Sequence, residues 1–80
     1  MSGGHFNYTQ FHFEDIAREI EKLILNNEYD YSIDTLNKFK KAAETCRKAA
    51  IMVQRVDYLV SDDDGEESFH KRWKEELKNI

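Results

Sequence analysis

One apolar repeat constrains the fold of this chain more than any other feature of the sequence. Between Ser32 and Val60, apolar residues recur at alternating spacings of three and four, and no proline interrupts them. The stripe consists of Leu36, Phe39, Ala43, Cys46, Ala50, Val53 and Val60, and Asp57 stands at the one remaining position. Such a repeat is typical of a long helix that packs at a shallow angle against another helix. We therefore expect a helix over residues 32–60, capped at its start by the Ser32 hydroxyl.

Helical spacing also predicts one helix before this segment and another after it. Over residues 11–27, apolar side chains lie on one face and charged ones on the other, and two asparagines can close the end of the helix. The apolar set is Phe13, Ile16, Ala17, Ile20, Leu23 and Ile24. Residues 65–79 follow a helix-breaking run of aspartates and place Phe69, Trp73 and Leu77 on one edge. The predicted fold class is all-α, a single three-helix domain over residues 1–80.

Residues 1–10 differ from the rest of the chain, because they show neither a helical pattern nor the composition of a solvated linker. Gly3 and Gly4 allow positive φ angles or a close approach of the backbone to a partner. Phe6 and Tyr8 are costly to leave in water. We expect a short structured arm that is rich in glycine and aromatic residues. The alternative is that residues 1–4 are an expression scar.

The second half of the predicted central helix is apolar nearly all round. Ile51, Met52, Tyr58 and Leu59 lie off the main stripe. A helix of this kind must be buried on most sides, and a chain of 80 residues has few other elements to cover it. We therefore expect a homo-oligomer that assembles through this helix.

Composition and charge argue against several classes of protein. No apolar run approaches the ~20 residues that span a bilayer, so we expect no membrane partner. Only residues 32–60 carry more Lys and Arg than Asp and Glu, and the acidic flanks would repel a long nucleic acid. A single cysteine and the lack of a secretory signal predict a cytoplasmic protein.

No pattern in the sequence indicates catalysis or a bound metal. The three histidines and Cys46 are irregularly spaced, which argues against a zinc site. The aspartates at residues 62–64, before Gly65, fail the register of a calcium loop. All-α nucleotide pyrophosphohydrolases use acidic pairs on helices, but the Glu-x-x-Glu pair is missing from residues 11–27. We expect no cofactor and no enzymatic activity, and keep such a hydrolase as an alternative.

Asp57 stands out on physical grounds, because a carboxylate on an apolar stripe is costly unless it is paired or hydrogen-bonded. It is either a structural residue, paired with an arginine or tyrosine or part of a polar layer between helices, or a carboxylate that faces a ligand. The basic residues of the central helix are either a solvated face or a surface for a compact phosphate-bearing ligand. The rings of the arm either cap the small core or offer a surface on which a base stacks.

Three stretches of the sequence are distinctive beyond their composition. The chain opens Met-Ser-Gly-Gly-His-Phe-Asn-Tyr and has Glu-Asp-Ile-Ala-Arg-Glu-Ile at residues 14–20. Residues 55–73 read Arg-Val-Asp-Tyr-Leu-Val-Ser-Asp-Asp-Asp-Gly-Glu-Glu-Ser-Phe-His-Lys-Arg-Trp. Together they resemble a family of small phage and prophage proteins that begin SGGHF. By a looser class similarity, such proteins resemble the nucleotide-signal sponges that phages use against the Thoeris and CBASS defence systems.

The resemblance implies a phage protein that binds and sequesters a small nucleotide immune signal, of the cyclic ADP-ribose or ADP-ribose-adduct type, without catalysis. The arm would contact the base and ribose, Arg55 a phosphate and Asp57 the ribose hydroxyls. The expected ligand-binding residues are His5, Phe6, Asn7, Tyr8, Arg55, Asp57, Tyr58, His70 and Trp73. The alternative function is a helical module that binds another protein through the same apolar and aromatic surfaces.

Overall fold

The computed structural model describes residues 4, 6–61 and 64–78, and no β-strand occurs within them. A single 3₁₀ turn, η1 (Thr9–Phe11), leads directly into α1 (His12–Asn26). The long helix α2 (Ile33–Val60) and the shorter α3 (Glu66–Lys78) follow. The predicted all-α fold of three helices is confirmed, and each helix lies within the residue range expected for it.

Local sequence signals set both ends of the connection between α1 and α2. After α1, Asn27 adopts a left-handed conformation with φ 39°, and its backbone N–H donates to the Leu23 carbonyl at 2.9 Å. The Asn27 side chain then accepts a hydrogen bond from the Tyr31 backbone N–H at 2.8 Å. Before α2, the Ser32 hydroxyl oxygen accepts from the Thr35 backbone N–H at 3.3 Å. Asparagine and serine act here as the helix-ending and helix-capping residues that the sequence predicts.

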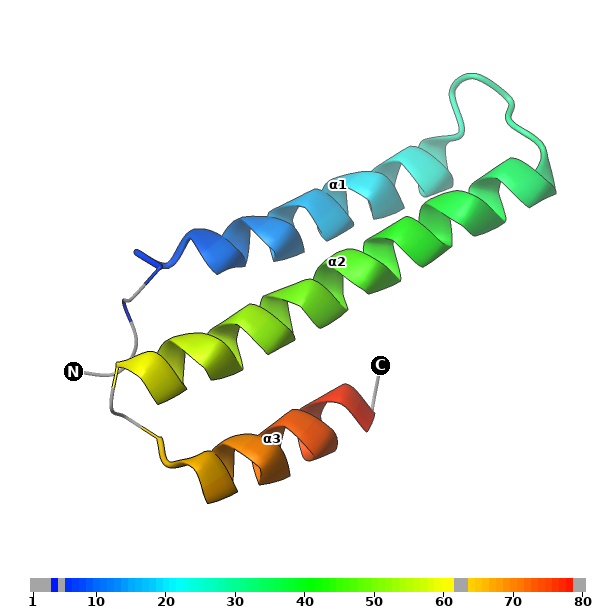
Figure 1. Cartoon of the computed structure of the whole chain (residues 1–80). Coiled ribbons are helices and arrows are strands. Elements are labelled where there is room, and N and C mark those ends of the chain that lie inside the picture. Colours follow the sequence, from blue (N-terminus) through cyan, green and yellow to red (C-terminus); the bar gives the residue numbers. More distant parts are fainter. Residues whose placement is uncertain (1–3, 5, 62–63, 79–80) are drawn as a thin grey trace.

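The three helices lie side by side in one layer, with α2 in the middle (Figure 1). Both α1 and α3 contact α2, and within the described residues they do not contact one another. The Cα positions extend over 47 × 24 × 12 Å with a radius of gyration of 15.4 Å, against about 12 Å for a compact domain of this length. The protein is thin and elongated, and two sides of α2 have no helix over them.

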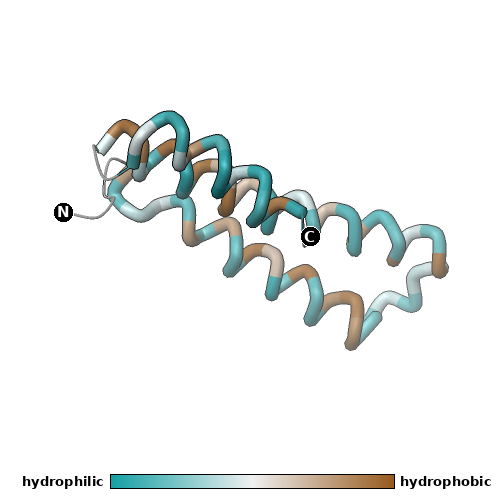
Figure 2. The backbone as a smooth tube through the Cα atoms, turned by 90° about the horizontal axis from the view of Figure 1, so that it is seen from below, coloured by the Kyte–Doolittle hydropathy of each residue, from teal (hydrophilic) through white to brown (hydrophobic). Residues whose placement is uncertain are grey.

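This layer buries few apolar side chains. Among the described residues, the buried apolar ones are the alanines Ala17, Ala43 and Ala50. Larger apolar side chains are half exposed, such as Ile16 at 48% and Leu23 at 47%. Figure 2 shows hydrophobic and hydrophilic segments alternating along each helix. The helices therefore leave apolar surface in contact with solvent, and the expected homo-oligomer stays a prediction.

The apolar second half of α2, which we expected another subunit to cover, is partly covered within the chain. α3 packs on α2, and Ile51, Met52, Tyr58 and Leu59 are all half-buried. Part of the cover that we expected a second subunit to provide for these side chains therefore comes from α3. No helix in the described part of the chain is long and apolar enough to cross a lipid bilayer.

One ion pair joins α1 to the first half of α2. Arg47 donates from its two terminal nitrogens to the two carboxylate oxygens of Glu21, at 2.6 and 2.7 Å. The hydrogen bonds from Arg47 lower the pKa of Glu21 below its ordinary value. A forked pair of this kind adds geometric specificity to its energy, so it helps to fix how α1 lies along α2.

We expect the stabilising effect of this pair to be present at neutral pH and to disappear in acid. Because the folded-state pKa of Glu21 is lowered, its contribution is complete above the ordinary value of 4.5 and is lost as the pH falls through the lower folded-state value. The melting temperature of Glu21→Gln should lie below that of the wild type at neutral pH, and the two should converge in strong acid. Glu28→Gln, at an exposed position of the connection, should follow the wild type throughout. A gap that persists in acid would contradict the assignment.

Candidate functional site

Asp57 lies at the centre of the candidate site and is fully buried. Its Oδ2 accepts hydrogen bonds from the Gly4 backbone N–H at 3.0 Å and from the Gln10 side-chain amide at 2.9 Å. Its Oδ1 accepts from the Ser61 hydroxyl at 3.1 Å. A buried carboxylate needs such donors. Of the two interpretations of Asp57, these contacts match the structural one, since the carboxylate faces its own chain and has no exposed surface for a ligand.

The arm reaches Asp57 through a series of tight turns. Gly4 takes φ 98°, a conformation that residues with a β-carbon rarely adopt, so glycine suits this position. Asn7 and Tyr8 adopt left-handed conformations with φ 57° and 60°. Such conformations cost of order 1–3 kcal/mol for residues with a β-carbon. The hydrogen bond from Gly4 to Asp57 therefore anchors a backbone segment that would not hold this shape alone.

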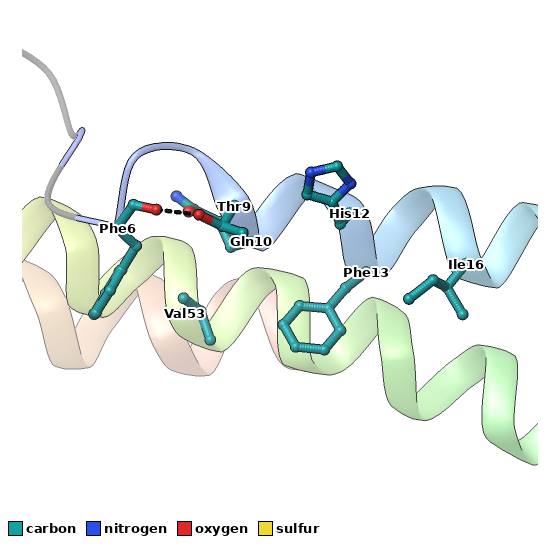
Figure 3. A pocket seen from close by; sticks show the side chains of 7 residues that line it. All are labelled: Phe6, Thr9, Gln10, His12, Phe13, Ile16 and Val53. Carbon is teal, nitrogen blue, oxygen red and sulfur yellow. Dashed lines mark hydrogen bonds between the residues drawn. The ribbon is translucent and has the colours of Figure 1, made fainter.

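A groove of about 390 Å³, which we call the arm groove, opens between the arm, α1 and α2. Its lining residues are Phe6, Thr9, Gln10, His12, Phe13, Ile16 and Val53. In Figure 3, Val53 lies between the rings of Phe6 and Phe13, and the His12 ring points away from that of Phe13. The lining contains no Asp, Glu, Lys or Arg. The groove has the size of a small-ligand site and an apolar, aromatic character.

Gln10 links the arm groove to Asp57, although it was not among the expected site residues. It is 2% exposed, and its side-chain amide donates to Asp57 and, at 2.6 Å, to Oε1 of Gln54. The Oε1 of Gln10 is itself buried and has no hydrogen-bond partner among the described residues. A buried acceptor without a partner is costly. This oxygen has almost no accessible surface, so a bound molecule would reach it only if the Gln10 side chain turned toward the groove.

A second depression, which we call the inter-helix cleft, lies between α1 and α3 on another side of α2. Its volume is also about 390 Å³, and its lining residues are Phe11, Glu14, Ala50, Ile51, Gln54 and Glu76. Ile51 and Val53 are two residues apart, or about 200° around a helix, so the cleft and the arm groove lie on different sides of α2. Two carboxylates in the cleft disfavour a phosphate there, because like charges repel.

Arg55, which we expected to bind a phosphate, is occupied within the protein. It is only 6% exposed. Its Nε lies 3.1 Å from a carboxylate oxygen of Glu76, and a terminal nitrogen lies 3.8 Å from Asp64. The guanidinium also stands 4.6 Å from the centre of the Tyr58 ring. In this conformation a phosphate would have to displace two carboxylates from a buried cation, which is costly.

The expected arm residues have different positions. Phe6 lines the arm groove, whereas Asn7 and Tyr8 lie in the exposed turn that follows it. The Tyr8 ring stacks on that of Phe11, with ring centres 6.3 Å apart. The prediction for His5 falls outside the described residues. The structure thus brings Phe6 to a groove and leaves the two residues after it beside that groove.

The expected residues of α3 line neither the arm groove nor the inter-helix cleft. Trp73 and His70 instead pack against the ring of Phe69, with ring centres 5.6 and 5.2 Å apart. Cys46 is half-buried in α2 as a free thiol. Within the part of the chain that the structure describes, no group of three or more His, Cys, Asp and Glu side chains could hold a metal ion.

Replacing Asp57 by asparagine should destabilise the fold and release the arm. The substitution keeps the size of the side chain but turns one acceptor into a donor, which then faces the donors of Gly4, Gln10 or Ser61. Because an unpaired buried donor costs about 1–3 kcal/mol, the free energy of unfolding in urea should fall by about that amount or more. Amide hydrogen exchange over residues 6–11 should accelerate. Asp34→Asn is the matched control: its side chain is 85% exposed and pairs only with Lys38 at the surface, so the change should cost less than about 1 kcal/mol and leave exchange in the arm unaltered. Unaltered exchange in the arm of Asp57→Asn would contradict the anchoring role.

Comparison with known proteins adds no relative to these observations. No protein-family model matches the chain, and no curated protein or solved structure matches it. The resemblance to small phage proteins stays a prediction made from the sequence, and function has to be argued from the geometry described above.

Proposed function

We propose that the protein binds and sequesters a small nucleotide signal without converting it, and that the base of the nucleotide occupies the arm groove. The observation that carries the proposal is a groove of ligand size that is lined by aromatic and aliphatic side chains. Base stacking on aromatic side chains is worth about 1–3 kcal/mol per base. The resemblance to phage nucleotide sponges points to the same class of ligand.

The arrangement of side chains in the groove suits a flat heterocycle. Phe6 and Phe13 stand on either side of Val53 (Figure 3), so a base can contact aromatic and aliphatic surface at once. The hydroxyl of Thr9 already donates to the Phe6 carbonyl, which supports the shape of this end of the groove. These features support recognition of a base rather than of a phosphate.

The phosphates of the ligand would lie outside the groove. The residues that line the groove include no Lys or Arg. Arg55 is paired with Glu76 and Asp64 and lies on a different side of α2. Any favourable contact with phosphate must therefore come from groups beyond the groove.

A helical protein-interaction module is the second candidate function, favoured by the apolar side chains that the fold leaves exposed. Ile16 and Leu23 lie on one side of α1 and are 48% and 47% exposed. An amphipathic helix of another protein could lay its apolar side on such a surface. In this case a nucleotide would have no effect on the protein.

Native mass spectrometry with cyclic ADP-ribose isomers, ADP-ribose adducts and cyclic dinucleotides tests the proposed function. We expect one of these compounds to be retained intact, in a simple ratio to the protein chains. Phe6→Ala should weaken its binding by about 5- to 150-fold, because the stacking energy of one base is lost. Tyr29→Ala is the matched control, since Tyr29 is a 71% exposed aromatic residue in the connection between α1 and α2. Its affinity should equal that of the wild type.

The other outcomes each favour a different assignment. Binding that Phe6→Ala leaves unchanged would place the ligand outside the arm groove. A wild-type protein that retains none of the nucleotides would favour the interaction module. Hydrolysis products that form when magnesium is present would favour the pyrophosphohydrolase alternative.

A further inference from the structure

One side of the α1–α2 pair carries the arm groove and an apolar surface that continues from it. Leu23 lies seven residues after Ile16, and Val60 lies seven residues after Val53, so both return to the same side of their helices. We call this surface the apolar face; it comprises Phe6, Phe13, Ile16, Leu23, Val53 and Val60. Ile16, Leu23 and Val60 are all about half exposed. Exposed apolar side chains that gather on one side of a protein are typical of an interaction site.

We infer that a second copy of this chain docks on the apolar face. The layer extends 47 by 24 Å along its two longer axes, so a second copy of the same dimensions can cover the apolar face over its full length. Stable domains are built from two packed layers around an apolar core. Two copies stacked through this face would form the two-layer core that a single copy, only 12 Å thick along its shortest axis, lacks.

Charges at the rims of the apolar face favour a second copy over an unrelated partner. On α1, Glu19 lies three residues after Ile16 and borders the face. On α3, Glu76 lines the inter-helix cleft. Lys74 and Lys78 each lie two residues from Glu76, which is about 200° around the helix, so both lie on the side of α3 opposite the cleft. The α1 rim is therefore acidic and the α3 rim basic. A two-fold axis parallel to α2 places the acidic rim of each copy against the basic rim of the other.

The same arrangement bears on the proposed ligand site, and this step alone rests on the proposed function. The arm groove would lie inside the interface, enclosed between the two copies. The basic rim of the second copy would approach the α1 side of the groove, whose own lining contains no Lys or Arg. A phosphate could then find its positive charge in the other copy.

Light scattering after size-exclusion chromatography of the ligand-free protein, at micromolar concentration, tests the interface. We expect a dimer for the wild type and a monomer for Ile16→Glu, because an unpaired carboxylate would be buried between the copies. Ile16 is 48% exposed in a single copy, so the variant should keep its helical circular dichroism. Leu25→Glu is the matched control. Leu25 is 84% exposed and lies nine residues after Ile16, so it is on the opposite side of α1, about 180° around the helix. This variant should remain a dimer.

Charge reversal at the rims identifies the partner as a second copy. Glu19→Lys alone and Lys78→Glu alone should each weaken the dimer by about 2- to 10-fold at low salt, and the double variant should recover most of the loss. A monomeric wild type, or equal dissociation by Leu25→Glu, would overturn the inference. A double variant no stronger than the singles would overturn the pairing of the rims. Because no nucleotide is used, these results are independent of whether the proposed function is correct.

Discussion

The buried carboxylate of Asp57 is the contact on which the rest of the structure depends. It lies in α2 and accepts hydrogen bonds from Gly4, Gln10 and Ser61, which belong to the arm, to η1 and to the residue that follows α2. A buried carboxylate that loses its donors is strongly destabilising, so α2 can bury this residue only when the arm is in place. The arm then forms one wall of the arm groove. A polar contact inside the protein thus fixes the shape of an apolar site at its surface.

The single-layer architecture explains why directional contacts matter so much here. α1 meets α2 through alanines, which let the two backbones approach but remove little apolar area from water. At about 25 cal/mol per Å² of buried apolar surface, such small side chains contribute far less than buried leucine or phenylalanine would. The hydrogen bonds of Asp57 and the forked pair of Arg47 and Glu21 therefore have a large share in setting how the arm and α1 lie on α2. Several large apolar side chains, such as Ile16 and Leu23, remain half exposed, where they are available to a partner.

The sequence predicted the helices and the burial of Asp57, but not the partners of the polar residues. Helices are local patterns, and a carboxylate on an apolar stripe signals its own burial. Gln10 lies three residues before Phe13, on the stripe of side chains that faces α2. Asp57 lies on the facing stripe of α2, so the pairing of these two polar residues could have been expected. The contact of Arg55 with Glu76 carries no such signal. It depends on which side of α2 receives α3, which the local pattern does not specify, and for that reason Arg55 was assigned to a phosphate.

Magnitudes link the proposed function to the proposed interface. A base in the arm groove gains about 1–3 kcal/mol from stacking. Stacking alone corresponds to a dissociation constant of several millimolar at best. A protein that removes a scarce signal needs binding several powers of ten tighter, and the described residues that line the groove of a single copy include no Lys or Arg. Enclosure and positive charge from a second copy would supply this affinity, so the proposed sequestration depends on the proposed dimer, whereas the dimer can form without any ligand.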